Sequence, residues 1–175
     1  MRKFRLIIGV LVMLLATAGL AAAKRNGTVA VVRGSPTMTI PLSEFNPDLE
    51  GDAEMQDLTY HIREEADGTL HGEYTYRLRV REQVNNYAGT IICMKVDGNR
   101  AWIGATVDET DNPAREGLYS WWQIADNGNG GPNSPDMTTF LGFGSLEATI
   151  AYCEGPEPNF IFQIQGGNIT VNDLD

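Results

Sequence analysis

Residues 93–136 read CMKVDGNRAWIGATVDETDNPAREGLYSWWQIADNGNGGPNSPD, and this stretch decides the fold. Apolar and polar side chains alternate on both sides of Asp97-Gly98, over Ile92 to Val96 and over Ala101 to Val107. Alternation with a period of two is the pattern of β-strands, and an Asp-Gly pair favours the positive φ angles of a type I′ turn. The stretch therefore predicts a β-hairpin at its start.

A further candidate strand, Leu118 to Ala125, carries large apolar side chains on both of its faces. Such a strand is expected in the middle of a sheet, with the core on one face and a loop or a partner on the other. Trp102, Tyr119 and Trp121 fall on the face away from the core in this pattern. They are the candidate residues for an aromatic surface that binds a small apolar ligand, a glycan or a protein partner.

The loop from Asp126 to Asp136 is rich in glycine, proline and asparagine, which favour neither helix nor strand. Its carboxylates, Asp126 and Asp136, are oxygen donors of the kind that Ca²⁺ binds, so calcium is a possible cofactor. The EF-hand spacing fails, because Gly128 and Gly130 occupy ligand positions. The alternative is a turn without metal, in which Asp126 accepts hydrogen bonds from nearby backbone N–H groups.

Four spaced motifs carry a resemblance to a known family: Cys-x-x-Val-x-Gly-Asn-x-Ala at 93–101, Asp-Asn-Gly-x-Gly at 126–130, Pro-Asp at 135–136, and Cys153. The pattern covers about residues 68–172 and resembles a widespread family of small secreted bacterial β-domain proteins of unknown function. This chain departs from it at Asn129, where the family usually has an acidic residue. The resemblance implies a compact exported domain and no established activity.

The first 23 residues have the three parts of a secretory signal: basic residues at 2, 3 and 5, an apolar run over 6–15, and small residues ending in Ala21-Ala22-Ala23. Cleavage is predicted after Ala23. No cysteine follows the run, and no later segment reaches the roughly 20 apolar residues of a membrane span. The mature protein is expected to be soluble and secreted or periplasmic, with a retained N-terminal anchor as the alternative.

Export and the acidic charge bear on two further properties, nucleic-acid binding and the state of the cysteines. The signal segment holds three basic residues and no acidic one, so its removal changes the formal charge from −10 to −13. An acidic domain binds nucleic acid poorly, because contacts with phosphate groups need Lys and Arg side chains. Two cysteines in an exported protein predict one disulfide, Cys93 to Cys153, whereas two free thiols are the alternative for a reducing compartment.

The N-terminal part, residues 24–56, is predicted to be irregular except for one short strand at Thr28 to Val32, and residues 57–175 are predicted to form a single β-domain. Within it, Asp67-Gly68 is expected to join two strands in a two-residue turn that pairs Glu64 with His71. Arg77, Arg79 and Arg81 lie on the wet face of the second strand and could bind an anion. Pairing with Glu64 and Glu65 across the hairpin is the favoured explanation, because such cross-strand pairs are common.

These patterns together predict an all-β fold of low helix content: an antiparallel meander of about eight strands closed into a barrel, with a two-sheet sandwich as the alternative. The chain lacks the G-x-S-x-G, H-E-x-x-H and phosphate-loop motifs, and C-x-x-C does not occur. The predicted function is an exported non-catalytic binding or structural module. A carboxylate-based secreted hydrolase that uses Glu64 and Glu73 is the alternative.

Overall fold

The computed structural model describes residues 27–128, 134–155 and 161–174. The signal-like segment lies outside the described residues. Strands dominate the fold, with one α-helix and two single turns of 3-10 helix among the described residues. The elements are β1 Thr28–Gly34, β2 Met38–Pro41, η1 Leu42–Glu44, β3 Asp52–Glu65, β4 Leu70–Val80, β5 Gln83–Asp97, β6 Arg100–Thr106, β7 Glu109–Thr110, η2 Pro113–Arg115, β8 Tyr119–Ala125, β9 Met137–Thr138, β10 Gly142–Gly144, α1 Leu146–Cys153, β11 Phe162–Gln163 and β12 Ile169–Asp173.

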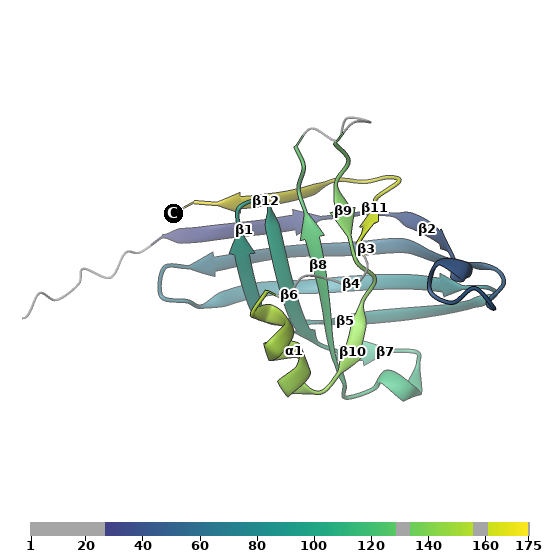
Figure 1. The fold of residues 1–175 in the computed structure, drawn as a ribbon. Helices are drawn as coiled ribbons and strands as arrows, with labels where there is room; N and C mark the ends of the chain where they lie inside the picture. Colours follow the sequence, from purple (N-terminus) through teal and green to yellow (C-terminus); the bar gives the residue numbers. More distant parts are fainter. Residues whose placement is uncertain (1–26, 129–133, 156–160, 175) are drawn as a thin grey trace, which may run out of the picture.

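All the described strands belong to one antiparallel sheet with the order β11-β9-β8-β6-β5-β4-β3-β1-β12, while β10, β2 and β7 pair with β8, β3 and β5. The sheet curls into two layers whose strands cross, with β12, β1, β3 and β4 behind and β6, β8 and β9 in front (Figure 1). The all-β antiparallel prediction is confirmed. The sheet has twelve strands in the described ranges rather than about eight, and the barrel is only partly closed.

The long strand β5 belongs to both layers. Its first part pairs with β4 from Gln83 to Thr90, and its second part pairs with β6 from Ile91 to Asp97. The β5–β6 register shifts between Ile91 and Cys93. A bulge bends a strand and increases its twist, and strands that pass between crossed sheets turn the corner in this way.

The core lies between the two layers and is lined by the inward-facing positions of each strand. Tyr74 of β4 and Trp122 of β8 are almost fully buried, and their ring centroids are 5.3 Å apart. Ser120 Oγ donates a 3.0 Å hydrogen bond to the Tyr74 hydroxyl. Burial, opposed by this hydrogen bond, raises the pKa of Tyr74 to about 12. The aromatic pair therefore joins the layers with the Tyr74 hydroxyl satisfied, whereas the buried Trp122 Nε1 has no hydrogen-bond partner among the described residues.

The predicted hairpin at Asp97-Gly98 is confirmed, since Asp97 pairs with Arg100 and the turn is Gly98-Asn99. Only Gly98 of these two has a positive φ, 59°, which fits a type II′ turn better than the expected type I′.

The second hairpin differs from the prediction by one residue. Glu65 N donates to Thr69 O, so the loop has three residues, and Glu64 pairs with Leu70 rather than with His71. A three-residue loop ends with a residue in the left-handed region, and Gly68 has a φ of 81°. On the exposed face of the sheet, His61 consequently lies opposite Glu73, and His71 lies opposite Arg63.

The segment before residue 57 is more ordered than the sequence suggested. The short strand expected at Thr28 is β1, which lies between β3 and β12. The expected irregular part contains β2 and the first residues of β3, which pair Met38 with Met55 and Ile40 with Ala53. Met38 and Met55 are buried in the core. Tertiary burial of these few apolar side chains offsets the local composition, which is rich in Pro, Asp and Glu.

Helix α1 is a feature that the sequence analysis missed. Ser145 caps its N-terminus by accepting a hydrogen bond from Ala148 N at 3.2 Å. Its buried residues are Thr149 and Cys153, whereas Leu146 and Ile150 are exposed. The helix therefore lacks the inward apolar stripe that periodicity detects.

Candidate functional site

Helix α1 covers the face on which the aromatic ligand surface was expected. Trp102 is buried at 4% exposure, and Tyr119 and Trp121 are half-buried. The rings of Trp121 and Tyr152 of α1 lie 5.8 Å apart. The structure thus brings these aromatics to one face of β6 and β8, and Trp121 packs against the helix. The predicted cover over this face exists, and it is a helix of the same chain.

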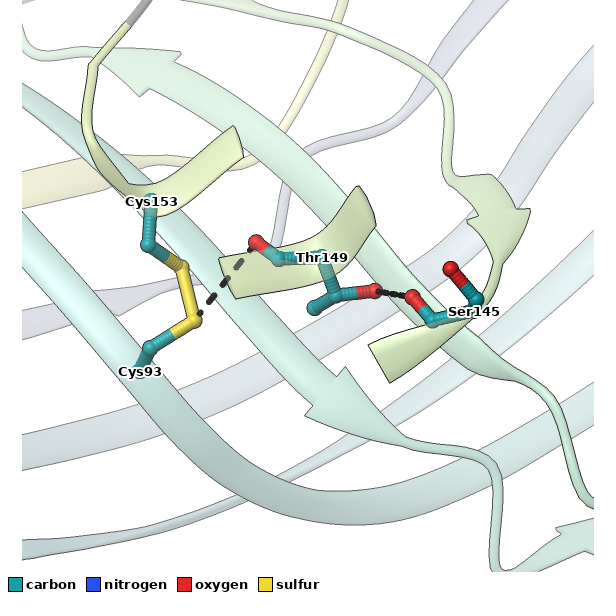
Figure 2. The surroundings of a disulfide bond; sticks show 4 residues. All are labelled: Cys93, Ser145, Thr149 and Cys153. Carbon is teal, nitrogen blue, oxygen red and sulfur yellow. Dashed lines mark hydrogen bonds between the residues drawn. A yellow bond between two sulfur atoms is a disulfide. The ribbon is translucent and has the colours of Figure 1, made fainter. Parts of the chain in front are cut away.

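The predicted disulfide is confirmed. Cys93 of β5 and Cys153 at the end of α1 are bonded, with Cα atoms 6.1 Å apart. Figure 2 shows the bond beside Thr149, whose hydroxyl donates to Ser145 O at 3.1 Å. A Cβ on Gly104 of β6 would lie 2.5 Å from Cys93 Sγ and 2.6 Å from Thr149 Cγ2. The helix can lie this close to the sheet only because residue 104 has no side chain.

The two loop carboxylates hold the free edge of β12. Asp126 Oδ2 accepts from Val171 N at 3.0 Å, and Asp136 Oδ2 accepts from Ile169 N at 3.1 Å. The other oxygens accept from Gly128 N and Asn127 N, at 2.9 Å in both cases. Asp126 therefore makes the Asx contact that was one of the two interpretations of this loop, and both aspartates also bridge the ends of the curled sheet.

These contacts bear on the calcium prediction. Each oxygen of the two carboxylates accepts a backbone N–H, and Asp136 is only 2% exposed. Burial, and then the charges of Asp136 and Asp126, raise the pKa of the nearby Tyr60 hydroxyl. In the described part of the chain no group of three or more His, Cys, Asp and Glu side chains could hold a metal ion. Residues 129–133 of the loop lie outside that part.

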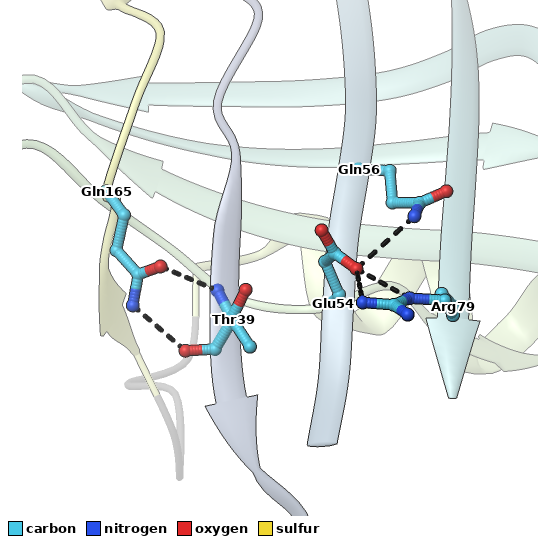
Figure 3. A network of polar contacts seen from close by, with 5 residues as sticks. All are labelled: Thr39, Glu54, Gln56, Arg79 and Gln165. Atoms are coloured by element: carbon cyan, nitrogen blue, oxygen red, sulfur yellow. Dashed lines mark hydrogen bonds and ion pairs between the residues drawn. The ribbon is translucent and has the colours of Figure 1, made fainter. Parts of the chain in front are cut away.

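Side chains also hydrogen-bond to the backbone groups of strands at two other places. The Gln165 amide accepts from Thr39 N at 3.0 Å and donates to Thr39 O at 2.9 Å, so it pairs with β2 as a backbone would (Figure 3). Asp111 accepts from the backbone N–H of Asn86 at 2.8 Å and from its side chain at 2.7 Å. These hydrogen bonds lower the pKa of Asp111. Exposed strand edges are aggregation sites, and such pairing covers them.

One interpretation of the sequence paired the arginines of β4 with Glu64 and Glu65. The structure does not have this pairing among the described residues. Arg79 forms an ion pair with Glu54 of β3, which also accepts from Gln56 (Figure 3). The Arg79 contact lowers the pKa of Glu54. Glu65 pairs instead with Arg63 of its own strand at 2.8 Å. The reason is register, since the antiparallel hairpin sets position 79 opposite 54.

The acid/base pair proposed for a hydrolase is separated by the sheet. Glu64 pairs with Leu70, and the alternation of β3 puts it on the inner face with Ile62. Glu73 belongs to the exposed positions of β4, on the outer face. A glycosidase needs its two carboxyl groups about 5 to 10 Å apart across one cleft. Glu64 and Glu73 are therefore not such a pair.

The outer face of β3, β4 and β5 carries two adjoining depressions, of about 730 Å³ and 570 Å³. We call them together the outer groove. Both are lined by Thr75, at the middle of β4. The larger is lined by Thr59, Tyr60, His61, Arg63, Leu70, His71, Gly72, Glu73, Tyr74, Thr75 and Thr90, and the smaller by Asp57, Thr75, Tyr76, Arg77, Asn86, Tyr87, Ala88, Glu109, Thr110 and Asp111.

Strand register arranges the groove in rows. Thr59, Thr75 and Ala88 lie opposite one another on β3, β4 and β5 and form a floor of small side chains. A row with His61, Glu73 and Thr90 flanks this floor on one side, and a row with Asp57, Arg77 and Asn86 flanks it on the other. Among the described residues none hydrogen-bonds or ion-pairs with the side chains of His61, Glu73 or Arg77. These groups are open to a ligand.

Sequence reasoning identified the wet face of the second strand and offered its arginines as an anion site, but it did not identify a groove. The alternation showed which residues face outward. The shape of a depression, however, depends on the twist of the three strands and on the position of β7, which pairs with β5. The sequence feature that could have indicated the groove is a set of small residues that lie opposite one another on three strands: Thr59, Thr75 and Ala88. It becomes readable only once the register is known.

Comparison with known proteins adds no homology to this geometry. No family model matches the chain, and neither a curated protein nor a solved structure is significantly similar to it.

Proposed function

We propose that the protein is an exported, non-catalytic binding module whose ligand lies in the outer groove. The observation that carries this proposal is the groove itself: two adjoining depressions that share Thr75 on a face of the sheet that no helix covers in the described structure. A pocket of several hundred Å³ with a few convergent polar groups is the default form of a ligand site.

The groove favours a polar, extended ligand. Its floor consists of threonines and an alanine, and its walls present imidazole, guanidinium, amide and carboxylate groups in rows. Such groups donate and accept hydrogen bonds from several directions, as the hydroxyl groups of a sugar do. A glycan chain that crosses the strands at Thr75 therefore suits the groove better than an apolar molecule.

A binding role fits the chemistry better than catalysis. Glu64 and Glu73 are on opposite faces of the sheet, so the proposed hydrolase pair cannot act on one bond. Asp111, at the far wall, is held by two hydrogen bonds to Asn86. A carboxylate whose pKa is lowered by such bonds is a poor proton donor near neutral pH.

Export is part of the same proposal. The signal-like segment 1–23, the disulfide and the resemblance to small secreted bacterial proteins support it. No helix of the described residues is long and apolar enough to cross a membrane. Sequencing the N-terminus of protein recovered outside the cytoplasm should give Lys24 as the first residue. An intact Met1 on exported protein would contradict the cleavage prediction.

A panel of neutral, uronate-containing and sulfated oligosaccharides tests the binding function. Wild-type protein should retain at least one of them, and Thr75→Trp should abolish retention because the indole fills the point where the two depressions meet. Asn172→Trp is the matched control: residue 172 is exposed on β12 and does not line the groove. Loss of binding in both variants, or in neither, would contradict the assignment, as would retention of no oligosaccharide by the wild type.

A further inference from the structure

We infer that the larger depression of the outer groove binds an anionic group of the ligand, and that acidification from pH 8 to pH 5 strengthens this binding. The ligand would be an acidic glycan, with carboxylate or sulfate groups. This inference rests on the proposed function and adds the charge of the ligand and the pH response. We call the part lined by His61, Arg63 and His71 the histidine end.

Basic side chains converge at the histidine end. Arg33 of β1 pairs with His61 of β3, and Arg63 of β3 pairs with His71 of β4. Positions on paired strands that lie directly opposite have Cβ atoms about 5 Å apart. His61, Arg63 and His71 all line the same depression.

This concentration stands out against the rest of the chain. The protein has a formal charge of −10, with 13 lysines and arginines against 23 acidic residues, and only two histidines. Both histidines line this one depression. The far wall of the groove is acidic, with Asp57, Glu109 and Asp111 around Arg77. The histidine end is therefore the less acidic end of the groove.

The charges that face the two histidines come from three strands and one loop. His61 lies between Arg33 on β1 and Glu73 on β4, and His71 lies opposite Arg63 on β3. Two further carboxylates complete the set. Glu65 is ion-paired with Arg63, and Asp108 accepts a 2.9 Å hydrogen bond from Thr90 of β5 at the rim of the depression.

The sign of the local charge changes with the protonation of the imidazoles. Two arginines and three carboxylates sum to −1 when both histidines are neutral, and two imidazolium charges change this sum to +1. Histidine is the side chain that changes charge between about pH 5 and 8, whereas carboxylates and arginines keep theirs over this range. The histidine end should thus change from repelling an anion to attracting one.

The test uses an oligogalacturonate and its fully methyl-esterified form, which have the same sugar backbone and differ in charge. The uronate stays ionised at pH 5, because a sugar carboxyl titrates below about pH 4. Titration calorimetry at pH 8 and pH 5 should show the Kd of the acid falling about fivefold, since each exposed ion pair contributes only a few-fold. The Kd of the ester should not change with pH. A sulfated oligosaccharide should behave as the acid does.

Variants locate the effect. His61→Gln and His71→Gln should each reduce the pH dependence of the Kd for the acid, and the double variant should remove this pH dependence. Asn172→Gln, on the exposed part of β12, is the control and should behave as the wild type. Because both histidines are exposed, the melting temperature should stay within a few degrees and show that the fold is intact.

Other outcomes overturn the inference in distinguishable ways. If the ester binds as tightly as the acid at both pH values and Thr75→Trp blocks both, the groove binds a glycan but has no anion site. If the double histidine variant keeps the pH dependence, the histidine end is not its source. If the acid, the ester and the sulfated oligosaccharide all fail to bind while another neutral oligosaccharide of the panel is retained, the inference falls and the proposed function stands. If no oligosaccharide of the panel is retained, both fall.

Discussion

The backbone N–H of Val171 donates a 3.0 Å hydrogen bond to the Asp126 carboxylate, which follows β8, 45 residues earlier in the chain. Val171 lies on β12, the last strand in the sheet order, and β8 lies near the opposite end of that order. Asp136, before β9, makes the equivalent bond to Ile169. Two side chains therefore connect ends of the sheet that are not joined to each other in the strand order, and these carboxylates hold the curled sheet in its partly closed form.

Removal of the Asp136 carboxylate should destabilise the protein more than removal of Asp126. Asp136 is almost completely buried, so Asp136→Ala leaves Ile169 N–H and Asn127 N–H without acceptors. The expected loss is about 3 kcal/mol for Asp136→Ala and about 1 to 2 kcal/mol for Asp126→Ala, from hydrogen bonds to charged groups. Urea unfolding monitored by tryptophan fluorescence measures both. Negligible losses would show that the carboxylates do not hold β12, and equal losses would contradict the predicted ranking.

Calcium provides an independent measurement on the same loop. If Asp126 and Asp136 act as backbone acceptors, millimolar CaCl₂ should not change the melting temperature relative to MgCl₂. A rise with calcium alone that Asp126→Ala abolishes would establish the metal interpretation instead. The comparison is made on the full exported chain, so that residues 129–133 are present.

The Gln165 side chain should protect the backbone of Thr39 from hydrogen exchange, as a neighbouring strand would. Its amide both accepts from Thr39 N and donates to Thr39 O. Gln165→Glu keeps the acceptor and loses the donor, whereas Gln165→Leu loses both. Hydrogen exchange at Thr39 N–H should therefore be fastest in the leucine variant and close to wild type in the glutamate variant. If the two variants exchange at the same rate, the side-chain pairing does not protect this edge.

Loss of the disulfide should release α1. The buried contacts of the helix are few, because its large aliphatic side chains Leu146 and Ile150 are exposed. Cys93→Ser combined with Cys153→Ser should lower the free energy of unfolding by about 4 kcal/mol, the chain-entropy value for a loop of this size. Near-UV circular dichroism should change as Tyr152 leaves Trp121. An unchanged spectrum in the folded double variant would mean that the helix needs no crosslink.

Gly104 should be intolerant of a side chain. An added Cβ would contact the disulfide and Thr149 at less than the van der Waals distance. Gly104→Ala should therefore cost about 1 to 3 kcal/mol, the usual range for overpacking. Gly27→Ala is the control, since nothing lies within 4 Å of its added Cβ. Equal stability of the two variants would show that α1 is not tightly packed on β6.

Stability should decrease in acid through Glu54 and Asp111. The Arg79 contact lowers the pKa of Glu54, and the Asn86 hydrogen bonds lower that of Asp111. A lowered folded-state pKa gives stability that is complete above the unfolded value of about 4 and is lost as the pH falls through the folded value. The melting temperature should fall below about pH 4, and less steeply in Asp111→Asn. An identical acid profile in that variant would exclude its contribution.

The sequence predicted local features well and global ones poorly. The alternation in β4, the turn at Gly98 and the Cys93–Cys153 pairing were all accessible, because each depends on neighbouring residues or on an even cysteine count. The role of β2 was missed, since its four residues are stabilised by tertiary burial. The helix was missed because its apolar side chains face outward.

The candidate site was hidden for a related reason. The register of β3 against β4 depends on whether the turn at Asp67-Gly68 has two or three residues, and one residue changes every facing pair. Glu73 therefore lies opposite His61, and Arg79 lies opposite Glu54. The aromatic face was inferred correctly as a covered face, but the cover proved to be α1 of the same chain.

The most direct test of the proposed function maps the ligand on the folded protein. Amide shifts in a ¹⁵N–¹H correlation spectrum, followed during titration with an oligosaccharide retained from the panel, should move most at Thr59, Thr75 and Thr90, which line the outer groove. Resonances of Trp102 and Trp121, which do not line the outer groove, should remain in place. Shifts concentrated at these tryptophans, with the three threonines unchanged, would contradict the outer groove as the binding site.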